Sequence, residues 1–285
     1  MSEFDVETVT KGGLVWPEGP RWQDGRLWFS DLFGNAIYTV DDDGKRERVA
    51  EFPLPSGVAF DDSGNPLVVS MQDGNVERLK GGRREIYADL KPVLGDPSHA
   101  NDMVQHASGR LYVGSMGYNL LAGEEERPTH IVLVDTDGSV RSVADEMYFP
   151  NAMVITPGGE TLIVAETFRG RLLAFDIGDD GALGNRRVWA SFDGTPDGIC
   201  LDAEGAVWCS SLAKSEFVRV HEGGEISDRI PTPGYFAICC MLGGDDRQTL
   251  YLGVSAVTPF EELPAGPEIG EVWRTRVDVR GAGRP

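Results

Sequence analysis

Short apolar runs separated by turn residues dominate the pattern of this chain. Apolar positions with a helical period are missing, and the runs are rich in β-branched and aromatic residues. Six of them each follow a turn segment containing Gly or Asp, and they span Arg26–Asp31, Pro66–Ser70, Arg110–Met116, Thr161–Thr167, Ala206–Leu212 and Thr249–Ser255. Six copies of one hairpin signal predict an all-β repeat protein.

A second apolar run and a second turn follow almost every hairpin, so each unit is expected to contain four strands. The first strands of the units begin at equivalent positions, which are Glu18, Ser56, Asn101, Asn151, Asp197 and Phe236. Successive starts are 38, 45, 50, 46 and 39 residues apart, which is the size of one propeller blade. The sequence therefore predicts a six-bladed β-propeller with four-stranded blades. A β-sandwich has similar turn spacing, but the sixfold regularity favours the propeller.

The sixth unit is one strand short. It contains Tyr235–Met241, Thr249–Ser255 and Glu271–Asp278, and then the chain ends. The leader Phe4–Thr10 alternates between apolar and polar residues and is predicted to supply the missing outer strand. This pairing would close the ring and remove an open sheet edge. No linker or shift in composition interrupts the repeats, so one domain is expected over residues 1–285.

Charge narrows the classes of partner. The 285-residue chain has 26 Lys and Arg residues against 46 Asp and Glu residues, a net charge of −20. This balance argues against nucleic acid and anionic membrane surfaces as partners, and it favours a small-molecule substrate. The segment Met1–Thr10 lacks the features of a signal peptide, and the four cysteines lie in apolar runs without metal-binding spacing. We therefore expect reduced thiols and a cytoplasmic location; the sequence does not predict the oligomeric state.

The equivalent strand starts carry the candidate chemistry. Four of the six hold a carboxylate or a carboxamide: Glu18, Asn101, Asn151 and Asp197. Strand starts of this kind surround the central channel of a propeller, so these four side chains should converge. Clustered carboxylates resist ionisation together, and a divalent cation removes that repulsion. Asp and Asn are also common turn residues, but their recurrence in four blades favours a metal site.

The donor set is all oxygen, which suits hard cations. One divalent ion is expected, with Ca²⁺ the best match and Mg²⁺, Mn²⁺, Zn²⁺ or Fe²⁺ as alternatives. Four protein ligands would leave positions on Ca²⁺ for water and a substrate oxygen.

Several motifs resemble the SMP-30/gluconolactonase/LRE family of six-bladed propellers. They extend from the first unit into the sixth, and they are Pro17–Pro20, Asn101-Asp102, Phe149–Ala152, Ala165–Thr167, Arg171–Asp176 and Thr195–Gly198. The resemblance implies that Glu18, Asn151 and Asp197 bind the metal, and that Asn101 binds the metal or the substrate. Members are mostly sugar lactonases, and relatives with this fold include organophosphate-hydrolysing phosphotriesterases.

Two departures from that family bear on the substrate. His99 stands where sugar-lactone members usually carry Arg, and Gly117, Tyr118 and Asn119 stand where they often have an acidic residue. Both changes remove a charged contact to sugar hydroxyls. We therefore expect a less polyhydroxylated lactone or ester, with His99, Tyr118, Asn119 and Asn101 as substrate contacts.

The favoured function is hydrolysis of a lactone or related ester by metal-activated water at the channel mouth. Asp197 is the candidate general base. An α/β-hydrolase triad is excluded because no G-x-S-x-G motif is present. A phosphotriesterase-like hydrolase, a biosynthetic cyclising enzyme and a non-catalytic Ca²⁺-binding regulatory propeller remain as alternatives. The physiological substrate and the native metal are not predicted.

Overall fold

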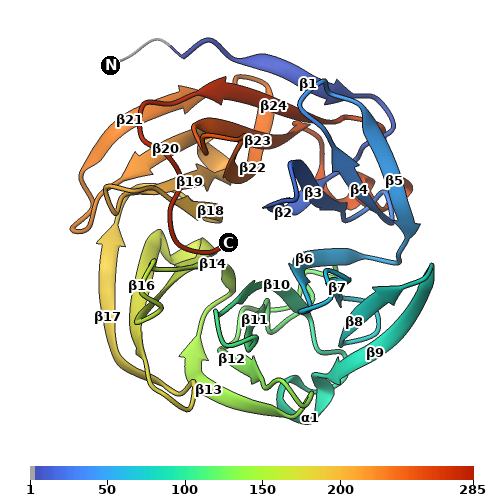
Figure 1. Ribbon diagram of the computed structural model, residues 1–285, viewed down its shortest axis with the longest axis vertical. Helices are drawn as coiled ribbons and strands as arrows, with labels where there is room; N and C mark the ends of the chain where they lie inside the picture. Colours follow the sequence, from blue (N-terminus) through green and yellow to red (C-terminus); the bar gives the residue numbers. More distant parts are fainter. Residues whose placement is uncertain (1–3) are drawn as a thin grey trace.

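Six four-stranded antiparallel sheets surround a central axis in the structure, a computed structural model that describes residues 4–285 (Figure 1). Each sheet is one blade, and in five of the six blades the strands follow one another in chain order from the axis outward. The predicted six-bladed propeller with four-stranded blades is confirmed. Residues 1–3, part of the segment Met1–Thr10 in which no signal peptide is expected, lie outside the described residues.

The first five blades are built from consecutive strands. Blade one is β2 (Pro17–Gln23), β3 (Arg26–Asp31), β4 (Ala36–Val40) and β5 (Arg46–Glu51). Blade two is β6 (Pro55–Phe60), β7 (Pro66–Ser70), β8 (Asn75–Lys80) and β9 (Arg83–Asp89). Blade three is β10 (Ala100–Gln105), β11 (Leu111–Ser115), β12 (Thr129–Val134) and β13 (Val140–Met147). Blade four is β14 (Pro150–Ile155), β15 (Thr161–Glu166), β16 (Arg171–Ile177) and β17 (Leu183–Ser191). Blade five is β18 (Pro196–Leu201), β19 (Val207–Ser211), β20 (Glu216–Val220) and β21 (Ile226–Pro231).

Blade six joins the two ends of the chain. It contains β22 (Tyr235–Gly243), β23 (Thr249–Ala256), β24 (Gly270–Arg276) and, as its outer strand, β1 (Glu7–Lys11). The N-terminal strand closes the ring as predicted, although it covers residues 7–11 and not 4–10. Phe4 does not pair in the sheet; its ring packs edge-on against Trp208 with centroids 5.8 Å apart.

Burial follows the position of each strand in its blade. The inner strands β14 and β18 are buried along their whole length, whereas the outer strands β5 and β9 are mostly exposed. The apolar faces of neighbouring blades pack against each other; one cluster joins residues of β10–β12 with residues of β14–β16. The core is therefore a ring of inter-blade layers, which holds the six inner strands in fixed positions around the axis.

Every inner strand has an irregularity in its pairing near its start. The register with the second strand shifts between Glu18 and Arg21, between Pro150 and Met153, and at the same place in the other four blades. A β-bulge bends a strand locally and redirects a side chain. These shifts occur at the positions that the sequence marks as candidate ligands, so the bulges set the directions of those side chains.

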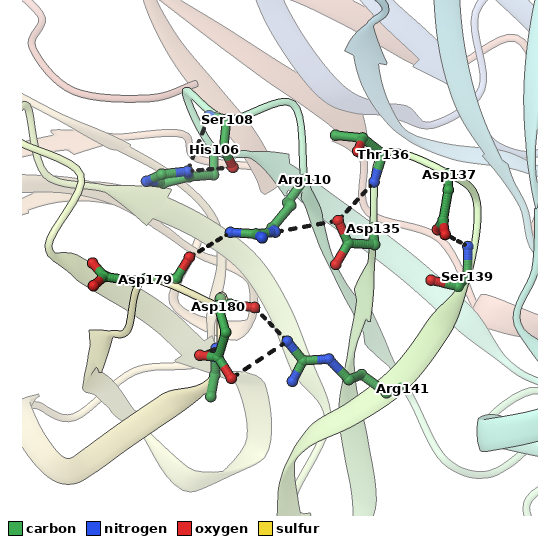
Figure 2. A network of polar contacts seen from close by, with 12 residues as sticks. His106, Ser108, Arg110, Asp135, Thr136, Asp137, Ser139, Arg141, Asp179 and Asp180 are labelled. Carbon is green, nitrogen blue, oxygen red and sulfur yellow. Dashed lines mark hydrogen bonds and ion pairs between the residues drawn. The ribbon is translucent and has the colours of Figure 1, made fainter.

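Two faces of the ring can be distinguished. We call the side where the inner strands begin the site face, and the side where they end the far face. Figure 2 shows a far-face network between blades three and four: Arg110 Nη1 donates to Asp179 O at 2.8 Å, and Arg110 Nε to Asp135 Oδ1 at 3.3 Å. Arg141 contacts Asp180 across the same boundary. His106 caps its own turn, because its Nδ1 accepts a hydrogen bond of 3.1 Å from Ser108 N.

The C-terminal segment 280–284 crosses the far face. The amides of Ala203, Gly281, Ala282 and Arg284 donate to the carbonyls of Arg280, Arg247, Leu201 and Ile155 over 2.7–2.9 Å. The segment therefore links blades six, five and four, and the C-terminus lies close to the centre of the ring (Figure 1). Gly283 has φ +66°, and a Cβ there would lie 2.3 Å from Ile155 O, so a residue with a side chain would not fit without a shift of the backbone.

Helical structure is confined to short segments in the connections. They are α1 (Lys91–Leu94) and the 3₁₀ turns η1 (Thr167–Arg169), η2 (Leu212–Lys214) and η3 (Phe260–Ala265). Within residues 4–285, none of these helices has the length and apolar character required to cross a bilayer.

Candidate metal centre

A chain of side-chain hydrogen bonds joins the inner-strand starts of four blades. Ser56 Oγ donates to Asn101 Oδ1 at 2.9 Å, and Asn101 Nδ2 donates to Asn151 Oδ1 at 2.9 Å. Asn151 Nδ2 in turn donates to Asp197 Oδ1. All four residues are buried. Three of the four predicted ligands, which are about 50 residues apart in sequence, therefore lie in direct contact.

Glu18, the fourth predicted ligand, lies in the same buried region. Its side chain is 7% exposed, and Oε1 accepts a hydrogen bond of 3.1 Å from Trp16 Nε1. Its carboxylate interacts electrostatically with Asp197 and Asp102. Glu18 thus interacts electrostatically with the candidate ligand Asp197. Its hydrogen bond from Trp16 anchors its carboxylate within blade one.

The two candidate carboxylates are poorly solvated. Burial, followed by the charges of Asp197 and Asp102, raises the pKa of Glu18 well above its usual range. Burial and the charge of Asp102 raise the pKa of Asp197 to about 8, although the hydrogen bond from Asn151 opposes the shift. Each carboxylate therefore resists ionisation unless positive charge is brought close to it.

The donor set fits a hard divalent cation. Glu18 and Asp197 supply carboxylate oxygens, and the amide oxygens of Asn101 and Asn151 each accept one hydrogen bond, which leaves a second lone pair. Over residues 4–285, no group of three or more His, Cys, Asp and Glu side chains is arranged to hold a metal. Any ion here would therefore depend on the two amides as well as the two carboxylates, which matches Ca²⁺ or Mg²⁺ better than a thiophilic metal.

Sequence reasoning missed two hydroxyl groups that support the amides. Ser56 occupies the position in blade two that is equivalent to the candidate ligands, and its hydroxyl donates to Asn101. The alignment of the six strand starts already placed Ser56 at this position. Thr167, on η1, accepts a hydrogen bond of 3.1 Å from Asn151 Nδ2. The motif Ala165–Thr167 includes Thr167, but nothing in that motif indicated its contact with Asn151, because Thr167 begins η1 directly after β15.

The three predicted substrate contacts beside Asn101 lie in connections on the site face, but no hydrogen bond joins them to the candidate ligands. Tyr118 is buried, and that burial raises its pKa. Asn119 Oδ1 accepts from Ala122 N at 3.0 Å, so its side chain organises its own loop. The roles of Tyr118 and Asn119 in substrate binding stay predictions.

His99 differs from Tyr118 and Asn119 in the state of its ring nitrogen. Its backbone has φ +49°, and its Nε2 atom is buried with no hydrogen-bond partner among residues 4–285. Desolvation lowers the pKa of His99, and Glu124 opposes that shift. A neutral imidazole with an unused ring nitrogen can bond a hydroxyl or a carbonyl. Because this nitrogen is buried in the structure, the contact of His99 with a substrate stays a prediction.

The position in blade six that is equivalent to the candidate ligands is apolar. The channel mouth on the site face therefore has a polar side and an apolar side. Phe236 occupies the position equivalent to Glu18 and Asp197, and it lies between those two blades. Its ring centroid is 5.2 Å from that of Phe260 and 5.7 Å from that of Trp16, and Phe33 lies 6.3 Å from Trp16. We call these four residues the aromatic cluster. Its three phenylalanines are partly exposed.

A separate cavity of about 410 Å³ lies on the far face, between blades four and five. Its lining includes Thr156, Asp202 and Glu204, which lie in the turns that follow β14 and β18, together with Trp189 of β17. It contains none of the candidate ligands. The cavity therefore belongs to the packing of two blades and is distinct from the candidate metal centre.

Comparison with known proteins assigns the propeller to a family. Residues 16–256 match the SMP-30/Gluconolactonase/LRE-like region, and the chain belongs to this family. A pentonolactonase, XacC of Haloferax volcanii, is 26% identical over 94% of this chain and 92% of its own length. A 6-deoxy-6-sulfogluconolactonase of Pseudomonas putida is 22% identical over 98% of this chain and 97% of its own.

A solved structure shares the fold over nearly the full length. The calcium-binding protein regucalcin of Agrobacterium tumefaciens has a TM-score of 0.83 and 22% sequence identity, covering 99% of this chain and 97% of that one.

Proposed function

We propose that this protein is a lactonase that depends on one divalent cation, held by Glu18, Asn101, Asn151 and Asp197. The observation that carries the proposal is the convergence of two buried carboxylates and two amides at one end of the propeller axis. The names of the relatives agree with it, since several are called lactonases.

The reaction is the addition of water to the lactone carbonyl carbon and cleavage of the ring C–O bond, which gives a hydroxy acid. When bound, the divalent ion supplies positive charge that ionises the carboxylates and polarises the carbonyl. Asp197 is the candidate general base, which would accept a proton from the attacking water. Asn151 holds Asp197 in position by its hydrogen bond.

The substrate we propose is less polyhydroxylated than gluconolactone. His99, two residues before Asn101, has an Nε2 atom with no hydrogen-bond partner among residues 4–285. Phe236 and Phe260 are partly exposed and pack on Trp16, which bonds to Glu18. A mouth with one polar and one apolar side suits a lactone ring that carries an apolar substituent.

A second candidate is a calcium-binding protein without turnover, because relatives of this chain include proteins named regucalcin. Initial rates with alkyl lactones, sugar lactones, aryl esters and phosphotriesters would separate the two. We expect hydrolysis of lactones that EDTA abolishes and added Ca²⁺ or Mg²⁺ restores. Stoichiometric metal binding without turnover of any of these substrates would favour the binding protein.

A matched pair of variants strengthens this assay. Asp197→Asn keeps the shape of the side chain and removes its charge, so it should abolish turnover. Asp246→Asn removes a carboxylate from an exposed far-face pair with Arg276 and should leave the rate unchanged. Activity of Asp197→Asn at the wild-type level would contradict the assigned role.

A further inference from the structure

A buried arginine lies beside the candidate metal centre and is not explained by it. Arg21 follows Glu18 on β2, directly after the register shift, and is 7% exposed. Its guanidinium contacts three oxygens: Nη2 donates to Asp102 Oδ1 at 3.1 Å and to Met103 O, and Nη1 donates to Pro20 O at 2.7 Å. Such a set of contacts, one carboxylate and two carbonyls, resembles the donor set of a cation site.

The contact spans three blades. Arg21 belongs to blade one and Asp102 to blade three, so the ion pair passes the inner strand of blade two. Gly57 on that strand leaves the room for it, because a Cβ there would lie 2.6 Å from Asp102 Oδ1 and 2.5 Å from Met103 N. The absence of a side chain at residue 57 is therefore a requirement of the Arg21–Asp102 pair.

Asp102 also acts on the candidate ligands. Its charge contributes to the raised pKa values of both Glu18 and Asp197, so the three carboxyl groups share one electrostatic environment. When all three are ionised, Arg21 offsets one negative charge and two remain. A single divalent ion would offset those two and leave the buried cluster neutral.

We propose that Arg21 is the fixed counter-ion of this cluster: it neutralises Asp102 and thereby sets the charge available to the exchangeable metal at two. Arg21 is a positioning residue and does not contact the proposed metal. A guanidinium suits this task because it stays charged under all physiological conditions and is held by its fork of donors. The inference rests on the proposed metal site and adds a residue that the family motifs quoted above do not assign a role.

A double-mutant cycle tests the proposal through metal binding. Asp102→Asn leaves the Arg21 charge without a partner, and its repulsion should weaken Ca²⁺ binding by at least about tenfold. Adding Arg21→Met removes that charge, and the double variant Arg21→Met/Asp102→Asn should recover the wild-type affinity. Calorimetric titration of the metal-free protein with CaCl₂ measures affinity and stoichiometry without any assay of activity.

The control variants distinguish the effect of charge beside the metal site from the effect of the protein's net charge and from a loss of folding. Asp246→Asn and Arg276→Met/Asp246→Asn make the same charge changes in an exposed pair and should leave the affinity unchanged. Thermal unfolding in EDTA should show that Asp102→Asn and Arg21→Met each lower Tm, since each leaves a buried charge unpaired, and that the double variant recovers part of the loss. Gly57→Ala should also lower Tm, because its methyl group displaces the Asp102 carboxylate from Arg21.

Two results would overturn the role of Arg21. One is unchanged Ca²⁺ affinity in Asp102→Asn, and the other is a folded double variant whose affinity is as low as that of Asp102→Asn. If the wild-type protein binds neither Ca²⁺ nor Mg²⁺, the proposed metal site itself is wrong. The unfolding cycle in EDTA would then still show whether Arg21 and Asp102 stabilise each other.

Discussion

Trp16 donates a hydrogen bond of 3.1 Å from its indole Nε1 to Oε1 of Glu18, while its ring packs against Phe236 and Phe260. One side chain therefore contacts both a predicted metal ligand and the apolar side of the mouth. The position of Glu18 therefore depends on the packing of the aromatic cluster. A substitution in the cluster should have a measurable effect on Glu18.

Trp16→Phe tests this dependence. The substitution keeps an aromatic ring and removes the donor to a carboxylate, a hydrogen bond worth about 1.5–3 kcal/mol. We expect Ca²⁺ affinity to change by about tenfold or more, as measured by calorimetric titration. Trp273→Phe is the matched control, because Trp273 Nε1 donates to Glu271 at 2.7 Å away from the site. Equal effects of the two substitutions would contradict a specific role for Trp16.

Removal of metal should destabilise the fold. A cation that binds only the folded state stabilises it by mass action, and it relieves the repulsion between Glu18 and Asp197. We expect EDTA to lower Tm, and Asp197→Ala to reduce that difference. Differential scanning fluorimetry with and without chelator measures both. Identical melting curves for wild type in EDTA and in CaCl₂ would count against a tight site.

The effect of metal on stability should depend on pH. The pKa of Asp197 is raised from 3.8 to about 8, so the metal-free fold retains a proton that the unfolded chain releases. The metal-free protein therefore loses stability as pH rises from about 4 to about 8. A cation competes with that proton, so the difference in Tm between CaCl₂ and EDTA should widen from pH 5 to pH 8. Asp197→Asn should give a smaller difference that changes less with pH, because only Glu18 still retains a proton; a constant gap in the wild type would refute the linkage.

Substrate preference gives another prediction. If His99 and the aromatic cluster set the specificity, kcat/KM should be higher for an alkyl-substituted lactone than for gluconolactone. His99→Arg restores the charged group expected for sugar-lactone members and should shift the ratio toward gluconolactone by roughly tenfold. Phe236→Ala should lower kcat/KM for the alkyl lactone and leave an unsubstituted lactone nearly unaffected. A clear preference of the wild type for gluconolactone would show that His99 and Phe236 do not set the specificity.

Much of this architecture could be predicted because it repeats. Glu18, Asn151 and Asp197 each take the second position of an inner strand, and the turn signals before β3, β7 and β19 fixed the phase of each blade. The contact of Asn101 with Asn151 followed from the convergence of strands at the axis.

Features without a repeating signal could not be predicted. The ion pair of Arg21 with Asp102 spans 81 residues of sequence and joins blade one to blade three. The hydrogen bond from Asn151 to Thr167 joins β14 to the 3₁₀ turn η1, which the sequence did not distinguish from the end of the neighbouring strand. These contacts depend on three-dimensional packing, which a local pattern does not encode.

The C-terminal segment should contribute to stability but not to the chemistry. Ending the chain after residue 279 removes five backbone hydrogen bonds to Arg247, Leu201, Ala203 and Ile155. After the ordering of the segment is allowed for, we expect a loss of about 2–4 kcal/mol in the free energy of unfolding. Urea denaturation measures this loss, and removal of Pro285 alone is the control. Equal stability of the two truncated chains would show that the segment is only loosely held.

The place where the chain ends also determines how the molecule can be attached to a surface. The last residues leave blade four on the far face near the axis, on the side opposite to Glu18 and Asp197. A tag or tether fused after Pro285 would therefore extend along the axis away from the mouth. Protein immobilised through this end would present the candidate site to the solution, with all six blades at similar distances from the support. The N-terminal strand offers no such geometry, because it lies on the rim and forms part of the closing blade.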